Sequence, residues 1–452
     1  MKYFLPKRRV SGQTLISLLI ALGIFGILAH AIFTLTTSSF KIVSFSRARI
    51  AGRHIAEEKI ETIRNMPYDT IGTAGGIPSG ILPQVENRFL NGLNYVIKIS
   101  VVYKDDPFDG LAPNDLLPTD YKSVRVEVSW QGAGAGATNN PVVITTDISP
   151  KGIETATGGG TLSILVFDAN ATPVSQATVN IFSDDVVPNI NITQNTNDNG
   201  RMIIPGIPQC LECYDITITK PGYSSDRTYS VSEVANPTKP PASIVEGALT
   251  EISFAIDRSS TLIVSTFSRL EGEFIPLPDT PFVITGTKTI GTDIYDYPVY
   301  KLNSQFTTGA SGTLTITDIE WDNYTLSLPL GSPYDFATTN PLNPYAVLPN
   351  MSVNWLLWLH DDTANNLRLI FIDSITNLVA SVSARLTGPG GFDETKITGN
   401  PQTPDFGQVF FPDLSSGTYS LTATSEAFLE VNKSVSVSGN TQDITVLDPI
   451  TP

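Results

Sequence analysis

Histidine and cysteine are nearly absent from this 452-residue sequence, which has three histidines and two cysteines. His30, His54 and His360 are far apart along the chain. The sequence therefore has too few histidines for a histidine-based metal site or a serine triad. We recognise no nucleophile motif and no glycine-rich phosphate loop either. The sequence therefore predicts a protein that is not an enzyme.

Charge is also scarce, at 16% of residues, and the net charge is −16. An acidic surface repels a phosphate backbone, so we expect no nucleic-acid partner. Glycine (34) and proline (32) are plentiful by contrast. This composition favours short strands joined by turns, and the length allows about three or four domains.

One long segment near the N-terminus, residues 10–40, contains no charged residue. About 20 apolar residues at 1.5 Å each match the hydrocarbon core of a bilayer. The basic residues 7–9 before it are expected to stay in the cytoplasm, which places the rest of the chain outside. An ordinary signal peptide has small residues after its apolar region, whereas Ser11 and Gly12 precede this one.

Residues 11–20, SGQTLISLLI, resemble the leader of type IV prepilins. The resemblance implies a leader of residues 1–12, which a prepilin peptidase cuts between Gly12 and Gln13 before it methylates Gln13. The subunit would then stay in the inner, cytoplasmic membrane as a single-pass protein until its helix packs against other pilins in an extracellular filament or at the cell surface. A plain signal anchor is the alternative.

Ser17 departs from the family pattern, which usually has glutamate at this fifth mature position. In the family that carboxylate is thought to neutralise the N-terminal amine of a neighbouring subunit. An unpaired charge at the bilayer centre costs about 2.5–3.5 kcal/mol on insertion scales, and serine offers only a neutral hydrogen bond. Loss of the glutamate is typical of minor subunits at a filament tip. The alternative is a lineage that tolerates serine in any subunit.

The helical pattern continues beyond the apolar run. Apolar residues recur at steps of three and four from Ala48 to Ile63, and charged residues occupy the other face. Pro67 ends the pattern. A transmembrane and stem helix over residues 13–66 would be about 80 Å long, and its end resembles the stem of pilins.

Residues 67–157 are expected to form a pilin-like β head on this stem. Residues 95–103 and 121–130 alternate apolar and polar side chains, as half-buried strands do. Residues 142–148 are a candidate third strand.

Aspartates are frequent between the first two of these strands. Asp105, Asp106 and Asp109 are candidate calcium ligands, because Ca²⁺ prefers several hard oxygen ligands on a flexible loop. The spacing of a strong calcium motif is missing, and aspartate also favours solvated turns. Both interpretations stay open, and we expect no other cofactor.

Three repeats of about 100 residues follow, at residues 158–257, 258–361 and 362–452. Each has a glycine, then Ile or Leu seven residues later, then a tyrosine: Gly200, Ile207 and Tyr214; Gly312, Ile319 and Tyr324; Gly407, Leu414 and Tyr419. Each repeat also begins and ends with an apolar strand. Many short strands per hundred residues are typical of a β-sandwich.

The first repeat, from LVFD at 165–168 to KPGY at 220–223, resembles the carboxypeptidase-regulatory-like, transthyretin-like module. The resemblance implies a spacer or binding module without catalytic residues. Related sandwiches in other pili carry Lys–Asn cross-links. The opening strands of these repeats contain no lysine, so we expect none.

Cys210 and Cys213 occupy the place where the first repeat has two extra residues, on an expected turn between strands. An oxidising exterior favours a small loop disulfide. A lone pair is only half a zinc site, and a redox motif normally opens a helix. We predict a structural disulfide.

These features predict a mainly β protein with one long N-terminal helix, a pilin-like α+β head and three β-sandwich domains. The predicted function is that of a minor pilin or pseudopilin that displays a β-sandwich stalk at the tip of a type IV-like filament. There it would contact a surface, cell or protein ligand that the sequence does not name. The alternative is a minor pseudopilin of a type II secretion-like system that engages exported substrates.

Overall fold

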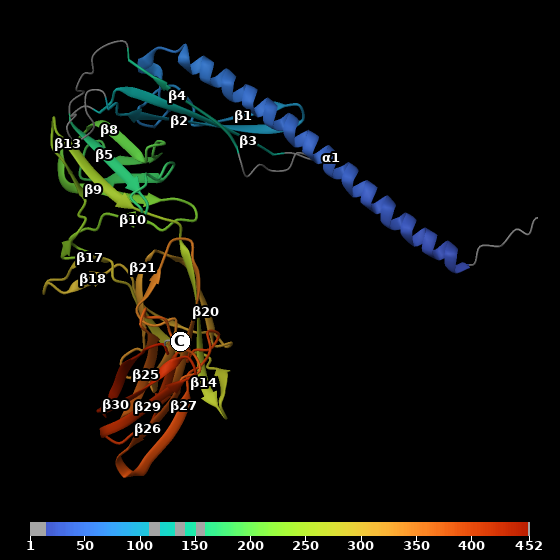
Figure 1. Cartoon of the computed structure of the whole chain (residues 1–452). Helices are drawn as coiled ribbons and strands as arrows, with labels where there is room; N and C mark the ends of the chain where they lie inside the picture. Colours follow the sequence, from blue (N-terminus) through green and yellow to red (C-terminus); the bar gives the residue numbers. More distant parts are fainter. Residues whose placement is uncertain (1–14, 108–117, 132–140, 151–158, 451–452) are drawn as a thin grey trace, which may run out of the picture. The chain divides into compact units, whose positions relative to one another are not determined.

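The structure, a computed structural model, describes residues 15–107, 118–131, 141–150 and 159–450. It confirms a mainly β chain with one long N-terminal helix (Figure 1). The main division between its two compact units falls between Thr157 and Gly158.

The first unit consists of the helix α1 (Leu15–Arg64), a short 3-10 turn (Tyr68–Thr70) and one antiparallel sheet. The strands β1 (Val85–Leu90), β2 (Leu93–Lys104), β3 (Tyr121–Gln131) and β4 (Val142–Ile148) pair in chain order. Three of them lie where the sequence predicts strands. The strand β1 is an addition, joined to β2 by Asn91 and Gly92, both with positive φ (53° and 79°), as a two-residue hairpin turn requires.

The first sandwich of the second unit is the module around the two cysteines. It contains β5 (Gly160–Phe167), β6 (Thr178–Ser183), β7 (Ile190–Asn195), β8 (Arg201–Ile207), β9 (Cys210–Thr219), β10 (Asp226–Arg227), β11 (Asn236–Pro237), β12 (Ala242–Ile244) and β13 (Leu249–Ala255). One sheet has the order β10-β9-β6-β7, with β12 on β9, and the other has the order β13-β5-β8.

The second sandwich has more strands than the sequence predicts. They are β14 (Ser260–Leu270), β15 (Glu273–Pro276), β16 (Pro281–Thr285), β17 (Thr289–Thr292), β18 (Pro298–Tyr300), β19 (Asn303–Thr307), β20 (Thr313–Ile319), β21 (Asp322–Ser327), β22 (Tyr334–Asn340), β23 (Tyr345–Val347) and β24 (Ser352–Asp361). The two main sheets are β15-β14-β24-β22, with β20 on β14, and β19-β16-β21-β23. A small third sheet, β11-β17-β18, adds a strand from the first sandwich.

The third sandwich is the simplest. It contains β25 (Asn366–Asp373), β26 (Ser383–Gly388), β27 (Phe392–Ile397), β28 (Gln408–Phe411), β29 (Gly417–Ser425), β30 (Phe428–Val437) and β31 (Asn440–Leu447). Its sheets are β28-β25-β31 and β27-β26-β29-β30. Large apolar side chains from both sheets fill the core between them, among them Phe371, Phe411 and Tyr419.

The repeated glycine has the same structural role in all three sandwiches. Its φ is 68°, 71° and 64° at Gly200, Gly312 and Gly407, in the left-handed region that side chains rarely adopt. Its carbonyl oxygen accepts a hydrogen bond of 2.8 Å from the backbone N–H of the opening strand, at Val166, Thr266 and Phe371 respectively. A Cβ atom on Gly200 would lie 2.5 Å from the Val166 oxygen. The glycine therefore lets the chain turn directly against the opening strand.

The cysteines differ from expectation in one respect. The prediction that they lie on a turn between strands is wrong, because both belong to β9. Residues 208–209 connect β8 to β9. The structure joins Cys210 and Cys213, whose Cα atoms are 6.0 Å apart, by a disulfide.

Candidate functional site

The first half of α1 exposes apolar side chains on all sides. Leu22, Phe25, Ile27, Leu35 and Phe40 are 67% to 72% exposed. A helix that is apolar all round is typical of a membrane span or of a helix buried by other chains. By length and composition, Leu22–Arg64 contains a stretch that could cross a membrane, with mean hydropathy 1.5.

Four hydroxyl groups in this half of the helix, those of Thr34, Thr36, Thr37 and Ser39, are bonded within the helix itself. Thr34, Thr36 and Ser39 donate to backbone carbonyl oxygens three or four residues earlier, at 2.8–3.0 Å. Because their donors are satisfied locally, these side chains need no water. The surface therefore suits lipid or a neighbouring helix.

The second half of α1 belongs to the head. Ala48, Ile55, Ala56 and Ile63 are at most 3% exposed and pack on the sheet. The transition from exposed to buried apolar side chains occurs near Phe45, whose ring lies 5.6 Å from that of Trp130. One continuous helix thus joins an unpartnered apolar half to a half fixed in a folded domain.

Polar contacts hold this second half at a defined position on the sheet. The helix-to-sheet bonds are Arg88 to Glu58 at 2.8 Å, Arg64 to the Thr146 hydroxyl at 2.8 Å, Tyr95 to the Ala48 carbonyl at 3.2 Å, and the ion pair of Lys59 with Glu86. The stem cannot slide along the head without breaking them.

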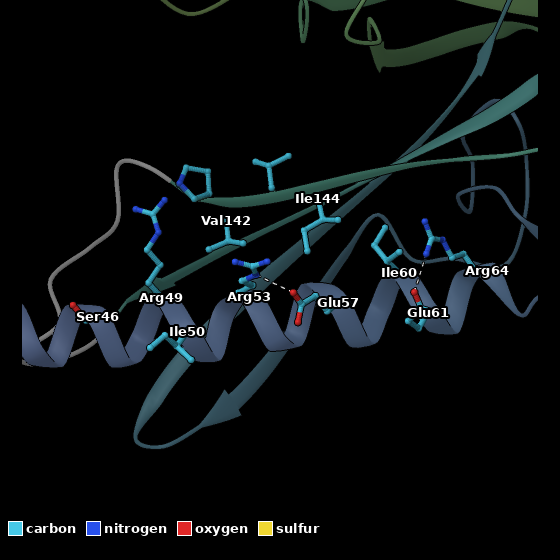
Figure 2. A pocket seen from close by; sticks show the side chains of 12 residues that line it. Ser46, Arg49, Ile50, Arg53, Glu57, Ile60, Glu61, Arg64, Val142 and Ile144 are labelled. Atoms are coloured by element: carbon cyan, nitrogen blue, oxygen red, sulfur yellow. Dashed lines mark hydrogen bonds and ion pairs between the residues drawn. The ribbon is translucent and has the colours of Figure 1, made fainter. Parts of the chain in front are cut away.

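A cavity of about 910 Å³ lies where α1 passes β4, the last strand of the head sheet (Figure 2). Apolar side chains of β4, including Val142 and Ile144, form one wall. Charged residues of the helix form the other, where Arg53 pairs with Glu57 at 2.8 Å and Arg64 with Glu61 at 2.9 Å. The sequence did not predict this cavity, because it depends on how β4 packs across the helix.

The residues predicted for processing and filament packing lie at or before the start of the described chain. Gly12 and Gln13 are outside the described residues. Ser17 lies in the first turn of α1, although its side chain is not among those described. Cleavage, methylation and packing therefore stay predictions.

The predicted calcium ligands are partly visible. Asp105 and Asp106 follow β2, whereas Asp109 is outside the described residues. The Asp106 carboxylate accepts a hydrogen bond from Tyr121, and its backbone N–H donates to Asp120 at 2.6 Å. Among the described residues, no group of three or more His, Cys, Asp or Glu side chains could hold a metal ion. The calcium site stays a prediction.

A buried lysine that the sequence did not predict binds the segment directly after α1 to the head sheet. Lys122 on β3 is only 4% exposed, and its Nζ donates to the carbonyl oxygens of Tyr68 (2.9 Å) and Ile71 (2.7 Å). Burial lowers the pKa of the Lys122 amine, which nearby Asp69 partly offsets. A lysine at a core-facing position of a predicted strand is the signal that points to it.

The N-terminal region matches one family model. Residues 7–33 fit the prokaryotic N-terminal methylation motif. The search of curated proteins found no match.

Several solved structures, two of them pilins, resemble the chain weakly. The major pilin subunit BcpA of Bacillus cereus is 13% identical, with a TM-score of 0.17, over 65% of this chain and 100% of that one. The minor pilin GBS52 of Streptococcus agalactiae is 12% identical, with a TM-score of 0.21, over 45% and 96%. The Bacillus anthracis TIE protein is 11% identical, with a TM-score of 0.19, over 82% and 76%. TM-scores this low support no conclusion about the arrangement or the function of this chain.

The motif covers the basic residues, Gly12, Gln13 and the start of the exposed apolar helix, and this confirms the prepilin-type N-terminus that the sequence predicts. The chain therefore has a prepilin-type N-terminus: a prokaryotic N-terminal methylation motif at residues 7–33 includes the start of one long helix, which leads into domains built of β-strands.

Proposed function

We propose that this chain is a minor pilin or pseudopilin, which enters a type IV-like filament through α1 and displays three β-sandwiches outside the cell. The observation that carries the proposal is the apolar half of α1, which is exposed on all sides and begins within the methylation motif. Such a surface requires lipid before assembly and other helices after it.

The position we propose within the filament is its tip. Ser17 cannot supply a carboxylate to the N-terminal amine of a preceding subunit, and a subunit at the tip has no preceding subunit to meet. The three sandwiches would extend from that end and contact a surface, a cell or a protein ligand.

Mass spectrometry of the mature protein tests the proposal. The mature chain should begin at Gln13, and that residue should carry an N-methyl group, because the peptidase we propose cleaves after Gly12. An N-terminus at Met1, or a cut beyond Phe33, would exclude assembly as a pilin.

A pair of glycine variants sharpens this test. Gly12→Leu should block cleavage and leave the unprocessed protein in the membrane, absent from sheared filaments. Gly26→Leu adds the same bulk within the apolar half, where a new Cβ would meet no atom within 4 Å, and should still be cleaved and methylated. Loss of processing in both variants would mean that any added bulk disturbs the helix.

A further inference from the structure

The first and last strands of every sandwich are parallel neighbours. In the first sandwich, β5 pairs with β13 over seven residue pairs, from Thr161 with Leu249 to Phe167 with Ala255. In the second, β14 pairs with β24 over seven pairs. In the third, β25 pairs with β31 over eight, from Asn366 with Asn440 to Asp373 with Leu447.

This pairing fixes how a pulling force enters each domain. The chain arrives at the N-terminal end of the first strand and leaves from the C-terminal end of the last strand. In a parallel pair these two points lie at opposite ends of the ladder. Tension along the chain therefore shears the two strands past each other and loads all ladder hydrogen bonds together, whereas tension applied at one end would open them one at a time.

The same strands carry the cores of the sandwiches. Leu162, Ile164 and Val166 on β5, and Phe254 on β13, are fully buried. In the third sandwich Phe371 on β25 and Leu447 on β31 are at most 1% exposed. Sliding one strand by a residue would turn such side chains from the core toward water, so the core resists shear together with the ladder.

Side chains brace two of the ladders directly. Arg201 on β8 donates to Ser163 on β5 (2.8 Å) and to Glu251 on β13 (2.6 Å), which are themselves a ladder pair. In the third sandwich the paired residues Asn366 and Asn440 share a hydrogen bond of 2.7 Å. The bonds span the very strands that tension would separate.

We propose a further function for the three sandwiches: they bear mechanical load, and each resists unfolding through a parallel clamp between its first and last strands. The clamp is non-covalent, since the opening strands β5, β14 and β25 contain no lysine for a cross-link. The proposed filament function supplies the source of the load. The clamp itself belongs to the isolated chain, so its test does not depend on assembly.

Single-molecule pulling on the full chain in detergent tests the clamp. One handle is attached at Ser149→Cys, an exposed position just after β4, so that the head lies outside the pulled segment. The second is attached either at a cysteine appended after Pro452, which shears all three ladders, or at Ser438→Cys, which lies just before β31 and is exposed. Pulling at residue 438 loads the third ladder from the end where Asn366 pairs with Asn440.

The released chain length identifies each sandwich. Extended chain spans roughly 3.3–3.6 Å per residue, so the longer second sandwich and the shorter third one give separate steps. With the Ser438 handle, the unfolding force of the third sandwich should fall several-fold. The forces of the first and second sandwiches, sheared in both geometries, should stay the same and serve as the internal control.

Equal unfolding forces of the third sandwich in the two geometries would overturn the proposal. If Ser438→Cys fails to fold, Glu246→Cys gives the same comparison on the first sandwich, because it lies on the exposed loop just before β13. There the force of the first sandwich should fall. A clamp that fails this test leaves the filament proposal intact, and failure to assemble leaves the clamp intact.

Discussion

A buried tyrosine makes the same local hydrogen bond in each sandwich. The phenol groups of Tyr214, Tyr324 and Tyr419 donate to the backbone carbonyl oxygens of Pro208 (2.6 Å), Glu320 (2.8 Å) and Ser415 (2.9 Å). The span is four residues in the later two sandwiches and six in the first. The two extra residues of the first repeat, at the start of β9, therefore lengthen the segment between the carbonyl group and the tyrosine. The hydrogen bond is kept, which explains the spacing seen in the sequence.

Tyr324→Phe removes this hydrogen bond and keeps the ring. We expect the second sandwich to lose about 0.5–1.5 kcal/mol of unfolding free energy, as for a typical intramolecular hydrogen bond. Tryptophan fluorescence during urea unfolding measures it, because Trp321, Trp355 and Trp358 all lie in this sandwich. Tyr295→Phe, at a side chain 73% exposed, is the matched control and should not move the transition. An unchanged transition in both variants would show that the bond contributes nothing.

The same tyrosine gives the second sandwich a response to alkali. Burial, with Asp322 and Glu320 nearby, raises the pKa of Tyr324 above its ordinary value of 10.0. Above that pH the unfolded chain loses the phenolic proton while the folded chain keeps it. The unfolding free energy is therefore intact below about pH 10 and falls as the pH rises further. In the urea experiment just described, Tyr324→Phe should flatten this decline.

At the scale of elements, β9 contains the most unusual local feature, the Cys210–Cys213 pair. The closed loop is very short, so the entropic stabilisation should be at the low end of the usual range of about 2–4 kcal/mol. The double variant Cys210→Ser, Cys213→Ser should therefore keep its fold, with a modest fall in the unfolding transition.

Thiol labelling of the wild-type chain under non-reducing conditions measures the pairing. Both thiols should be blocked, and they should become reactive after reduction. Free thiols in the untreated protein, or one bound zinc per chain, would contradict a disulfide.

Alternation of apolar residues predicts the strands whose two faces differ. It locates β2 and β3 of the head, whereas runs of apolar residues locate the first and last strands of each sandwich. It misses β1, where the burial of Val85–Leu90 is slight and only the Asn91-Gly92 turn marks a hairpin. It also misses the short β17 and β18, which form a small sheet of their own with β11. Their pairing comes from tertiary contacts that local pattern does not encode.

The candidate site, like the fold, was predictable only in part. Composition alone identifies the apolar half of α1, because such a surface has few roles in water. The cavity beside β4 and the anchoring of Lys122 require the packing of the head on the helix. Arg53 is not distinctive in the sequence. Lys122 stands out only as a lysine at a core-facing strand position, because its partners come from the chain after the stem.

For the molecule as a whole, two independent features favour the proposed tip position. The first is Ser17, which lacks the charge that would pair with a neighbour's amine. The second is bulk and charge: each copy carries three sandwiches beyond its head, and the chain has a net charge of −16. Copies crowded along a shaft would repel one another. A single copy at the tip has no preceding subunit to pair with and no neighbouring copy to repel it.

Immunogold labelling against the third sandwich tests this position. We expect label at filament ends, at about one site per filament, as the one-subunit geometry of a tip requires. Ser17→Glu restores the carboxylate and should shift some label into the shaft, within what the bulk of the sandwiches allows. Ser17→Gln matches its size without the charge and should leave the label at the ends. Label spaced along the whole shaft of wild-type filaments would contradict the tip position, and an equal shift in both variants would show that size at residue 17, rather than charge, selects the place of the subunit.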